Sequence, residues 1–417
     1  MTTPLSAAEA ARRILEDVRR QPALRVPLDD ALDSVLVEDV VSPIDIPAWT
    51  NSAMDGYAAR GDDVRGASAE RPVRLRVVEA LPAGAFPTRP LGAGEVARIF
   101  TGAPLPDGAD TVVRQEDTDQ GTETVSIVRD RDVGVNIRRT GEDIRRGTTV
   151  LTAGMALGPA HLGVLASLAV AYPLVYRRPR VAILGSGDEI VDVDRPEEIL
   201  SGRKTASSNT HTLVALVRGA GGEPINLGIA RDTPESLREH LRRALDYDLL
   251  VTTAGISVGE HDYVRSVLEE LGTEHRFWKV SMRPGAPVGF GLLRGIPWIG
   301  LPGNPVSTMV TFELFVRPAI RKMTGHPLPF RRSVPVRTAE PISLKPKLQH
   351  FLRGVVREGR DGPEARLTGP QGSGILTSMV LANALLVIPE GQFETPAGAM
   401  VQAIRLDDPV HQGEPAF

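Results

Sequence analysis

The spacing of apolar residues changes several times along this chain, and each spacing predicts a type of structure. Ser6 and Glu9 have the spacing of a capping box, and the apolar residues within 14–18 predict a first helix. Residues 28–36 repeat the helical spacing and predict a second helix. From about residue 40 to 135, short β-rich segments between Gly and Pro turns predict a small β-rich domain. Residues 140–176 return to helical spacing, so we expect them to pack with the first helices and the β-rich part to be an insertion.

Between residues 179 and 325, strand-like and helical segments alternate, which predicts a parallel sheet covered by helices on both faces. The predicted strands are residues 181–184, 224–228, 248–252 and a pair ending at Ile299, and the predicted helices lie at 210–217, after Thr233, at 264–271 and from Val306. Ligands of such sheets bind at the carboxyl ends of the strands. After Pro327, short strands between Gly and Pro turns predict a terminal β-barrel-like or sandwich domain.

The expected fold class is therefore a multidomain α/β protein, which agrees with a length of 417 residues, more than one core usually organises. Its predicted parts are an N-terminal helical linker domain (1–45 plus 140–176), a β-rich inserted domain (46–139), a central three-layer α/β/α domain with a mostly parallel sheet (177–326) and a C-terminal β-barrel-like domain (327–417).

Composition excludes several classes of function. The formal charge is -4 from 48 basic and 52 acidic residues, without a basic block, so we expect small-molecule partners and no nucleic acid. Cysteine is absent and the eight histidines lack zinc-ligand spacing, so a bound metal would have oxygen ligands. No secretory signal pattern opens the sequence, and the apolar segment 162–172 is too short to span a membrane, so we expect a cytoplasmic protein with this segment as a buried helix.

Three predicted strands of the α/β domain end in polar, Gly-rich loops: residues 185–189, 254–262 and 302–305. Glycines allow backbone N–H groups to approach a phosphate, and carboxylates such as Asp188 beside them can hold a hard divalent cation. Taken singly, such an acidic loop is more often solvated or a helix cap. Three of them at one sheet edge favour a shared site for an anionic, phosphorylated ligand.

The third loop, Pro302 to Pro305, has the features of an anion site. Pro305 at the first helical position loses no needed donor, Asn304 is placed to cap, and the following N–H groups point at whatever lies in front of them. Lys279 and Arg283 flank a short segment where both could face the same anion, although each alone is typical of a surface cation.

The β-rich region contains two further strings with candidate chemistry. Asp55 lies in a run of small residues, and Thr101 exposes a hydroxyl in a tight turn. From chemistry alone, both turns favour a structural role, as does the acidic and basic segment 136–144.

Together these strings resemble the MoeA family of molybdopterin molybdenumtransferases, whose animal counterpart is the terminal domain of gephyrin. The resemblance covers nearly the whole chain in order and spacing. The strings that carry it are Asn51-Ser52-Ala53-Met54-Asp55-Gly56-Tyr57, Thr101-Gly102-Ala103-Pro104, Gly141-Glu142-Asp143, Gly187-Asp188-Glu189, Ser257-Val258-Gly259-Glu260, Leu301-Pro302-Gly303-Asn304-Pro305-Val306-Ser307, Gly372-Ser373-Gly374 and Ile388-Pro389-Glu390-Gly391.

The resemblance implies four domains and an elongated homodimer, with a cleft between the α/β domain of one subunit and the β-rich domain of the other. It implies a reaction in which adenylylated molybdopterin and molybdate react, the adenylate is hydrolysed with Mg²⁺, and AMP is released. Molybdopterin adenylyltransferase is a further candidate partner. No membrane partner is expected.

Residue roles follow from the resemblance position by position. The implied catalytic residues are Asp55, Thr101, Asp188, Asp232, Asp262 and Lys279. The implied substrate-binding residues are Gly187, Gly255, Ser257, Gly259, Arg283, Pro302, Gly303, Asn304, Pro305 and Ser307. The implied metal ligands are Asp188, Glu189 and Asp262, and the opposite subunit is implied to supply Asp55 and Thr101.

The chain departs from the family pattern at Thr50, Ser207, Ala254, Arg283 and Ala286. Ala286 removes a cation that the family usually has. Two alternatives therefore stay open: a degenerate paralogue that acts as a molybdopterin-binding or scaffold dimer, and a molybdopterin adenylyltransferase, which would not need the β-rich domain.

Overall fold

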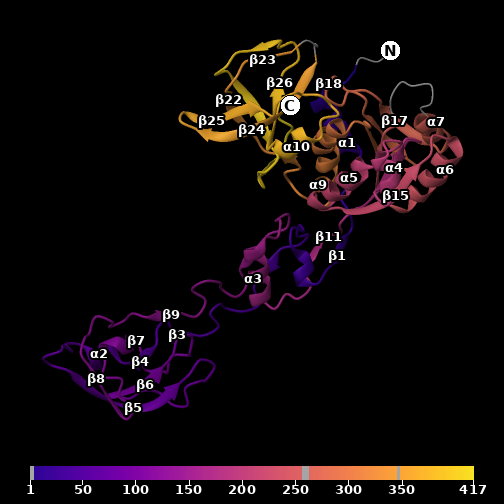
Figure 1. Cartoon of the computed structure of the whole chain (residues 1–417). Coiled ribbons are helices and arrows are strands. Elements are labelled where there is room, and N and C mark those ends of the chain that lie inside the picture. The colour runs from indigo at the N-terminus through magenta and orange to yellow at the C-terminus, as the bar shows by residue number, and fades with distance from the viewer. Residues whose placement is uncertain (1–3, 256–262, 345–347) are drawn as a thin grey trace. The chain divides into compact units, whose positions relative to one another are not determined.

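The computed structural model describes residues 4–255, 263–344 and 348–417 (Figure 1). The chain divides into two compact units. The larger unit comprises Met1–Val37, Gly154–Leu162 and Ala171–Phe417, and the smaller unit comprises Glu38–Ala153 and Gly163–Val170. Each unit is described below by itself.

The larger unit contains the predicted α/β sheet, which has six strands. In spatial order they are β15 (Glu223–Ala230), β12 (Arg180–Ser186), β16 (Leu249–Thr253), β20 (Ile296–Leu301), β19 (Gly289–Leu293) and β17 (Thr273–Phe277). The first four run parallel, and β19 runs antiparallel to both of its neighbours. The mostly parallel sheet predicted from the alternating pattern is therefore present.

Two hydrophobic cores cover the two faces of this sheet. Along β12, Val181 and Ile183 belong to one core, and Ala182 and Leu184 belong to the other, because neighbouring strand residues point to opposite faces. The helices that contribute to the first core are α1 (Ala7–Asp17), α5 (Ser208–Gly219), α8 (Pro305–Thr311), the π-helical η4 (Phe312–Val316) and α9 (Arg317–Met323). The second core contains residues of α6 (Pro234–Arg243) and α7 (Tyr263–Glu270). The helical layers on both sides agree with the predicted three-layer arrangement.

The first helix forms as predicted but packs elsewhere. The Ser6 side chain accepts a hydrogen bond from the backbone N–H of Glu9 at 3.2 Å, as a capping residue does. The sequence analysis predicted that this helix packs with residues 140–176 in a linker domain. In the structure, Ala7, Ala11 and Ile14 of α1 are instead buried in the core on one face of the α/β sheet.

The second predicted helix was wrong. Residues 28–36 form only a short 3₁₀ turn, η1 (Leu28–Ala31), and Asp33 has φ 60°, a backbone conformation that ends a right-handed helix. Val35 and Leu36 instead form single β-bridges with Ala156 and Val175.

The helical prediction for residues 140–176 was right only for α3 (Pro159–Ser167). Strand β10 (Thr149–Leu151) precedes this helix, and strand β11 (Leu174–Tyr176) follows it and pairs with β1 (Ala23–Arg25). Leu165 is the buried residue of α3, so the expected buried helix was also wrong. Within the described residues, no helix combines the length and apolarity that crossing a bilayer requires.

The terminal part of the larger unit is a β-barrel. Five strands pair in a closed ring, since the last strand in the order returns to the first. They are β24 (Gln349–Gly359), β25 (Gly362–Leu367), β22 (Ser333–Thr338), β28 (Met400–Arg405) and β26 (Ala384–Ile388). Closure leaves few unpaired edges, and Val336, Leu352 and Leu386 fill the interior. The short strand β18 (Met282–Arg283), from the α/β segment, adds in parallel to β24.

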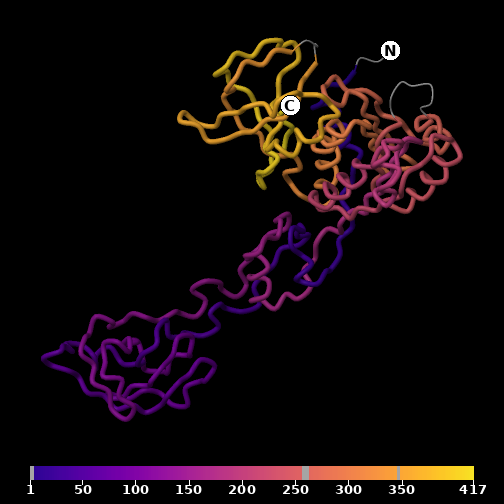
Figure 2. The backbone as a smooth tube through the Cα atoms, viewed as in Figure 1, coloured from indigo at the N-terminus to yellow at the C-terminus, as the bar shows by residue number. Residues whose placement is uncertain are grey.

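The smaller unit is β-rich, as predicted (Figure 1), and Figure 2 traces its backbone. Its five-stranded sheet has the order β7 (Thr111–Arg114), β4 (Gly56–Ala59), β6 (Glu95–Ile99), β5 (Val73–Leu81) and β8 (Thr124–Ile127). Alternate residues of β4 supply its two cores, with Tyr57 in one and Ala58 in the other. The finer division of the chain into four domains stays a prediction.

Candidate active site

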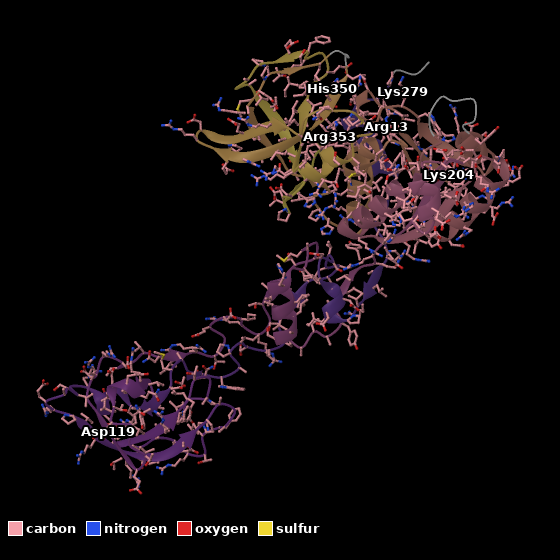
Figure 3. The ribbon with its side chains drawn as sticks, in the orientation of Figure 1. Arg13, Asp119, Lys204, Lys279, His350 and Arg353 are labelled. Atoms are coloured by element: carbon pink, nitrogen blue, oxygen red, sulfur yellow. The ribbon has the colours of Figure 1, made fainter. Side chains whose placement is uncertain are left out.

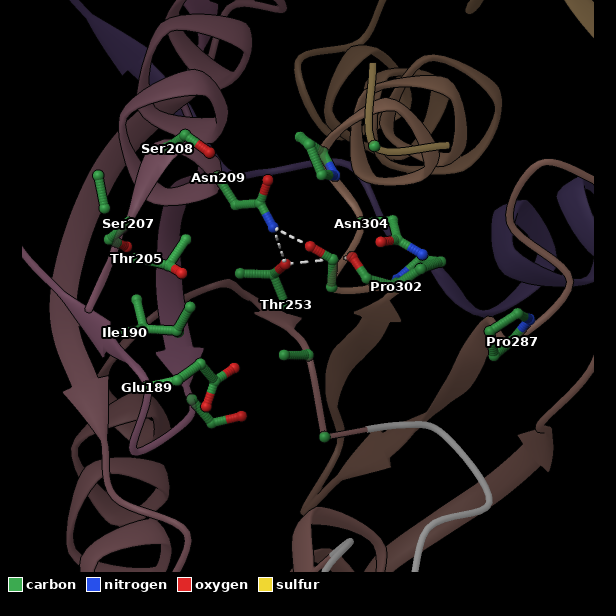
Figure 4. A pocket seen from close by; sticks show the side chains of 18 residues that line it. Glu189, Ile190, Thr205, Ser207, Ser208, Asn209, Thr253, Pro287, Pro302 and Asn304 are labelled. Atoms are coloured by element: carbon green, nitrogen blue, oxygen red, sulfur yellow. Dashed lines mark hydrogen bonds between the residues drawn. The ribbon is translucent and has the colours of Figure 1, made fainter. Parts of the chain in front are cut away.

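Three neighbouring parallel strands of the larger unit, β12, β16 and β20, end beside one cavity (Figure 4). The cavity has a volume of about 600 Å³. Its described lining comes from the three polar loops, from the start of α5, and from single residues of other segments: Gly185, Ser186, Glu189, Ile190, Thr205, Ala206, Ser207, Ser208, Asn209, Thr253, Ala254, Gly255, Pro287, Pro302, Gly303, Asn304, Pro305 and Gly374. The described parts of the three loops therefore meet at one sheet edge, as the sequence predicted.

Asn209, which the sequence analysis missed, connects two of the strand ends. Its Nδ2 donates hydrogen bonds to Oγ1 of Thr253 at 3.0 Å and to the carbonyl oxygen of Gly303 at 2.8 Å (Figure 4). The Thr253 hydroxyl in turn donates to the carbonyl oxygen of Pro302 at 3.3 Å. The side chain from the first turn of α5 therefore fixes the position of the third loop against β16.

The third loop has the predicted strand–turn–helix form, with two differences. Asn304 occupies the N-cap position of α8, but its side chain makes no capping hydrogen bond. The N–H of Val306 donates to the carbonyl oxygen of Ser373 at 3.1 Å, so it is not free for an anion. Pro302, Gly303, Asn304 and Pro305 line the cavity, whereas Ser307 is buried and does not.

The first loop carries two of the predicted carboxylates. Gly187 has φ 135°, a backbone conformation that residues with a Cβ rarely adopt, so this position favours glycine. Glu189 lines the cavity, but Gly187 and Asp188 do not. Asp188 is joined to Asp232, because each backbone N–H donates to the carboxylate of the other, at 3.3 and 3.4 Å.

The second loop is described only at its beginning. Ala254 has φ 70° and Gly255 also has φ 70°, and both line the cavity. The predicted residues Ser257, Gly259 and Asp262 lie outside the described residues. Within the described part of the chain, no group of three or more acidic or histidine side chains is close enough together to hold a metal.

The predicted cations do not line this cavity. Lys279, which is labelled in Figure 3, and Arg283 are exposed. Both are absent from the described lining of the cavity, whereas Pro287 is present. Among the described lining residues, Glu189 is the ionisable side chain, and the remaining polar groups are hydroxyls, an amide and the backbone.

The barrel also contributes to the lining, through Gly374. The buried Arg353, labelled in Figure 3, holds the loop that contains Gly374. Its Nη2 donates to the carbonyl oxygen of Gly372 at 3.0 Å, and its Nε donates to Oγ of Ser378 at 3.1 Å.

The sequence offered one signal for the lining residues on α5 that were missed. This signal was the polar run Ser207-Ser208-Asn209 at the start of a helix.

In the smaller unit, the structure joins Asp55 and Thr101, two predicted residues from separate strings. The backbone N–H and the hydroxyl of Thr101 both donate to Oδ1 of Asp55, each at 2.8 Å. These two hydrogen bonds lower the pKa of Asp55 below its ordinary value. Asp55 is exposed and therefore presents a stabilised carboxylate at the surface of this unit.

Family profiles match three consecutive parts of the chain. The MoeA N-terminal region (domain I and II) matches residues 5–169, the probable molybdopterin binding domain residues 182–322, and the MoeA C-terminal region (domain IV) residues 335–406. Molybdopterin molybdenumtransferase 2 of Mycobacterium tuberculosis is 39% identical over 405 residues, which cover 95% of this chain and 98% of that protein. This chain belongs to the MoeA family.

Other members of the MoeA family agree over similar lengths. Molybdopterin molybdenumtransferase of Nostoc sp. is 38% identical, covering 89% of this chain and 86% of that protein. The crystal structure of the molybdopterin biosynthesis moeA protein from Pyrococcus horikoshii OT3 has a TM-score of 0.79 and 29% identity, and covers 96% of this chain and 99% of that chain. The match extends through the β-rich region as well as the α/β domain.

Proposed function

We propose that this protein is a molybdopterin molybdenumtransferase of molybdenum cofactor biosynthesis. It takes adenylylated molybdopterin and molybdate, transfers molybdenum to the pterin, hydrolyses the adenylate and releases AMP. The observation that carries this proposal is the cavity at the ends of β12, β16 and β20, with its lining of backbone, hydroxyl and amide groups. Its volume of about 600 Å³ lies within the range of small-molecule sites.

The lining suits a ligand that combines a phosphate with a polar ring. Backbone N–H groups of the loops around Gly255 and Gly303 supply uncharged donors to phosphate oxygens, and glycine allows the close approach. Asn209 has a positioning role. Its amide N–H groups donate to Thr253 and to Gly303, so they hold the Gly303 loop and are not available to the ligand.

The carboxylates at this edge fit magnesium by their donor chemistry. Glu189 lines the cavity, and Asp188 lies in the same loop beside Asp232, so the available side-chain donors are hard oxygens. Magnesium is typically held by one or two carboxylates together with substrate phosphates and water. Asp188, Glu189 and Asp262 would hold it, and bound magnesium would neutralise phosphate charge.

We propose that the active form is a homodimer whose cleft receives Asp55 and Thr101 from the opposite subunit. The lowered pKa of Asp55 keeps its carboxylate ionised, so it acts as a fixed negative charge held by Thr101. We propose that Lys279 and Arg283 contact the anionic substrate outside the described lining. We also propose that a molybdopterin adenylyltransferase delivers that substrate. The cytoplasm stays the expected location.

One assay tests the reaction. Purified protein is mixed with adenylylated molybdopterin, magnesium and molybdate, and AMP is followed with time. AMP release that rises with molybdate supports the proposal. Binding of the pterin without AMP release would instead indicate a scaffold, and pyrophosphate formation from ATP an adenylyltransferase. The chain is similar to molybdopterin molybdenumtransferases over nearly its whole length, and this similarity favours neither of the two alternatives.

A second experiment tests the shared cleft. Asp55→Asn keeps an oxygen acceptor for Thr101 but removes the charge, and Asp262→Asn alters the other half of the proposed site. Each variant alone should be nearly inactive. An equimolar mixture should recover about a quarter of the wild-type activity, because roughly half of the randomly paired dimers are heterodimers and each heterodimer has one intact cleft. No recovery, with subunit exchange verified by mass spectrometry, would refute a cleft built from two subunits.

A further inference from the structure

The larger unit has a second cavity, of about 480 Å³, which shares no described lining residue with the first. It lies between the end of α5, helix α9 and the paired strands β21 (Phe330–Arg331) and β29 (His411–Gln412). Its lining includes five arginines: Arg178, Arg218, Arg317, Arg321 and Arg331.

The deepest charges form a triad with an excess of positive charge. Both carboxylate oxygens of Glu313 are used by Arg317, with Nε to Oε2 at 2.6 Å and Nη2 to Oε1 at 3.0 Å. Nε of Arg331 also donates to Oε2 of Glu313 at 2.6 Å. All three side chains are largely shielded from solvent, so one carboxylate neutralises two buried guanidinium groups only in part.

Arg321 adds a further positive charge, which only the exposed Asp33 opposes among the groups that shift its pKa. It follows Arg317 by four residues on α9, so both lie on the same face of the helix. Its Nε donates to the carbonyl oxygen of Leu328 at 3.3 Å, and no ion pair of Arg321 is found among the described residues. Burial, with the charges of Arg317 and Arg331, lowers the pKa of Arg321 to about 10.

The acidic residues of the lining do not balance this charge. Asp407 is paired with Arg405 at 2.9 Å, and Asp408 lies 3.8 Å from Arg332. Arg178 and Arg218 add two exposed cations, and Asp33 adds one exposed carboxylate, whose charge acts on Arg321.

His411 supplies an independent sign that a ligand belongs here. Its Nδ1 lies 2.7 Å from the carbonyl oxygen of Pro409, and since a carbonyl only accepts, Nδ1 carries the proton. Its Nε2 is buried and has no hydrogen-bond partner among the described residues. Burial and the charges of Arg321, Arg331 and Arg317 lower the pKa of His411 to about 4. At neutral pH, Nε2 is therefore an unprotonated acceptor without a donor.

We propose that this cavity binds hydrogen phosphate, whose negative oxygens face the arginines and whose O–H group donates to Nε2 of His411. Such a ligand supplies both the charge and the proton that the cavity lacks. A fully deprotonated tetrahedral anion such as sulfate supplies only the charge. The site is independent of the proposed catalytic function.

Calorimetric titration of the full-length protein with inorganic phosphate tests the proposal, at pH 7 and an ionic strength held constant with chloride. We expect saturable binding to wild type and to Asn209→Ala, which alters only the first cavity. Arg321→Gln should weaken binding about tenfold or more, because it removes a charge-assisted contact. Arg218→Gln, at an exposed position, should weaken it by a smaller factor. Arg243→Gln, an exposed arginine of α6, is the matched control and should bind as wild type does.

The second arm compares anions. Wild type should bind sulfate at least about tenfold more weakly than phosphate, because Nε2 of His411 then loses its donor. His411→Phe should lose most of this preference. The proposal is overturned if wild type shows no saturable phosphate binding, if Arg321→Gln and Arg218→Gln both bind phosphate as wild type does, or if sulfate binds wild type as tightly as phosphate.

Discussion

Replacing Glu313 with glutamine should destabilise the larger unit strongly. Glu313 lies in η4, is 6% exposed, and accepts hydrogen bonds from Arg317 and Arg331 through both carboxylate oxygens. Glutamine has almost the same shape, but it removes the charge and turns one acceptor into an N–H₂ donor that faces a guanidinium group. Two buried cations then have no counter-charge.

Two estimates of the cost agree. Breaking a buried ion pair by removing one partner typically costs about 3–5 kcal/mol. Burial alone would raise the pKa of Glu313, but the charges and hydrogen bonds of Arg317 and Arg331 outweigh it and lower the pKa from 4.5 to about 2. A shift of that size corresponds to roughly 3 kcal/mol of folding free energy, present above pH 4.5 and lost as the pH falls towards 2. We expect Glu313→Gln to lose about 3 kcal/mol at pH 7.

Urea unfolding followed by tryptophan fluorescence measures this loss. Trp278 and Trp298 report the larger unit, and a Trp49→Phe background removes the tryptophan of the smaller unit. Glu239→Gln, at an exposed position of α6, is the matched control and should stay within about 0.5 kcal/mol of its parent. A Glu313→Gln protein within about 1 kcal/mol of its parent would refute the account of the triad as a net stabilising contact.

Three further perturbations have definite expected results. Asn209→Ala removes two hydrogen bonds worth about 1 kcal/mol each, so kcat/KM for AMP release should fall roughly tenfold to thirtyfold, and an unchanged value would contradict its positioning role. Ala254 has a left-handed backbone conformation, which costs an alanine about 1–2 kcal/mol. Ala254→Gly removes this cost but gives the unfolded chain more conformational entropy, so thermal unfolding should show a free energy of unfolding higher by roughly 0.5 kcal/mol. Burial lowers the pKa of His326 to about 3 and that of His411 to about 4, both from 6.5, so between pH 6.5 and 4 the unfolded chain binds more protons than the folded chain. The free energy of unfolding measured in urea should therefore fall as the pH falls through this window. The fall is up to about 1.4 kcal/mol per pH unit for each ring, and less for the partly exposed His411. His326→Asn should make the free energy of unfolding depend less steeply on pH.

The predictions that succeeded rest on local patterns with a direct physical cause. Thr233 followed by Pro234 predicted the start of α6, and the Thr233 hydroxyl does accept from the N–H of Ser236. Strand β12 is apolar at every position from Val181 to Leu184 because both of its faces are covered, which is why it read as a parallel-sheet strand.

The predictions that failed depended on partners distant in sequence. Residues 28–36 have helical spacing, but Val35 and Leu36 pair with segments more than a hundred residues later, and this pairing overrides local propensity. Asn209 joins Thr253 to Gly303, and no spacing in the sequence indicates that contact. The lining of the second cavity comes from segments as distant in sequence as Asp33 and His411. Its excess of positive charge therefore could not be predicted from a chain whose overall charge is nearly balanced.

The two cavities would bind anions by different physical means. In the first, the described lining includes one ionisable group, the carboxylate of Glu189, so backbone and hydroxyl dipoles orient a phosphate but do not neutralise it. An anionic substrate there needs a cation from outside the described lining, which is the role proposed for magnesium, Lys279 and Arg283. The second cavity has the opposite imbalance, because Arg321 and the triad around Glu313 already supply the cations. What it lacks is negative charge and one proton donor, so its affinity for phosphate should not depend on a divalent metal.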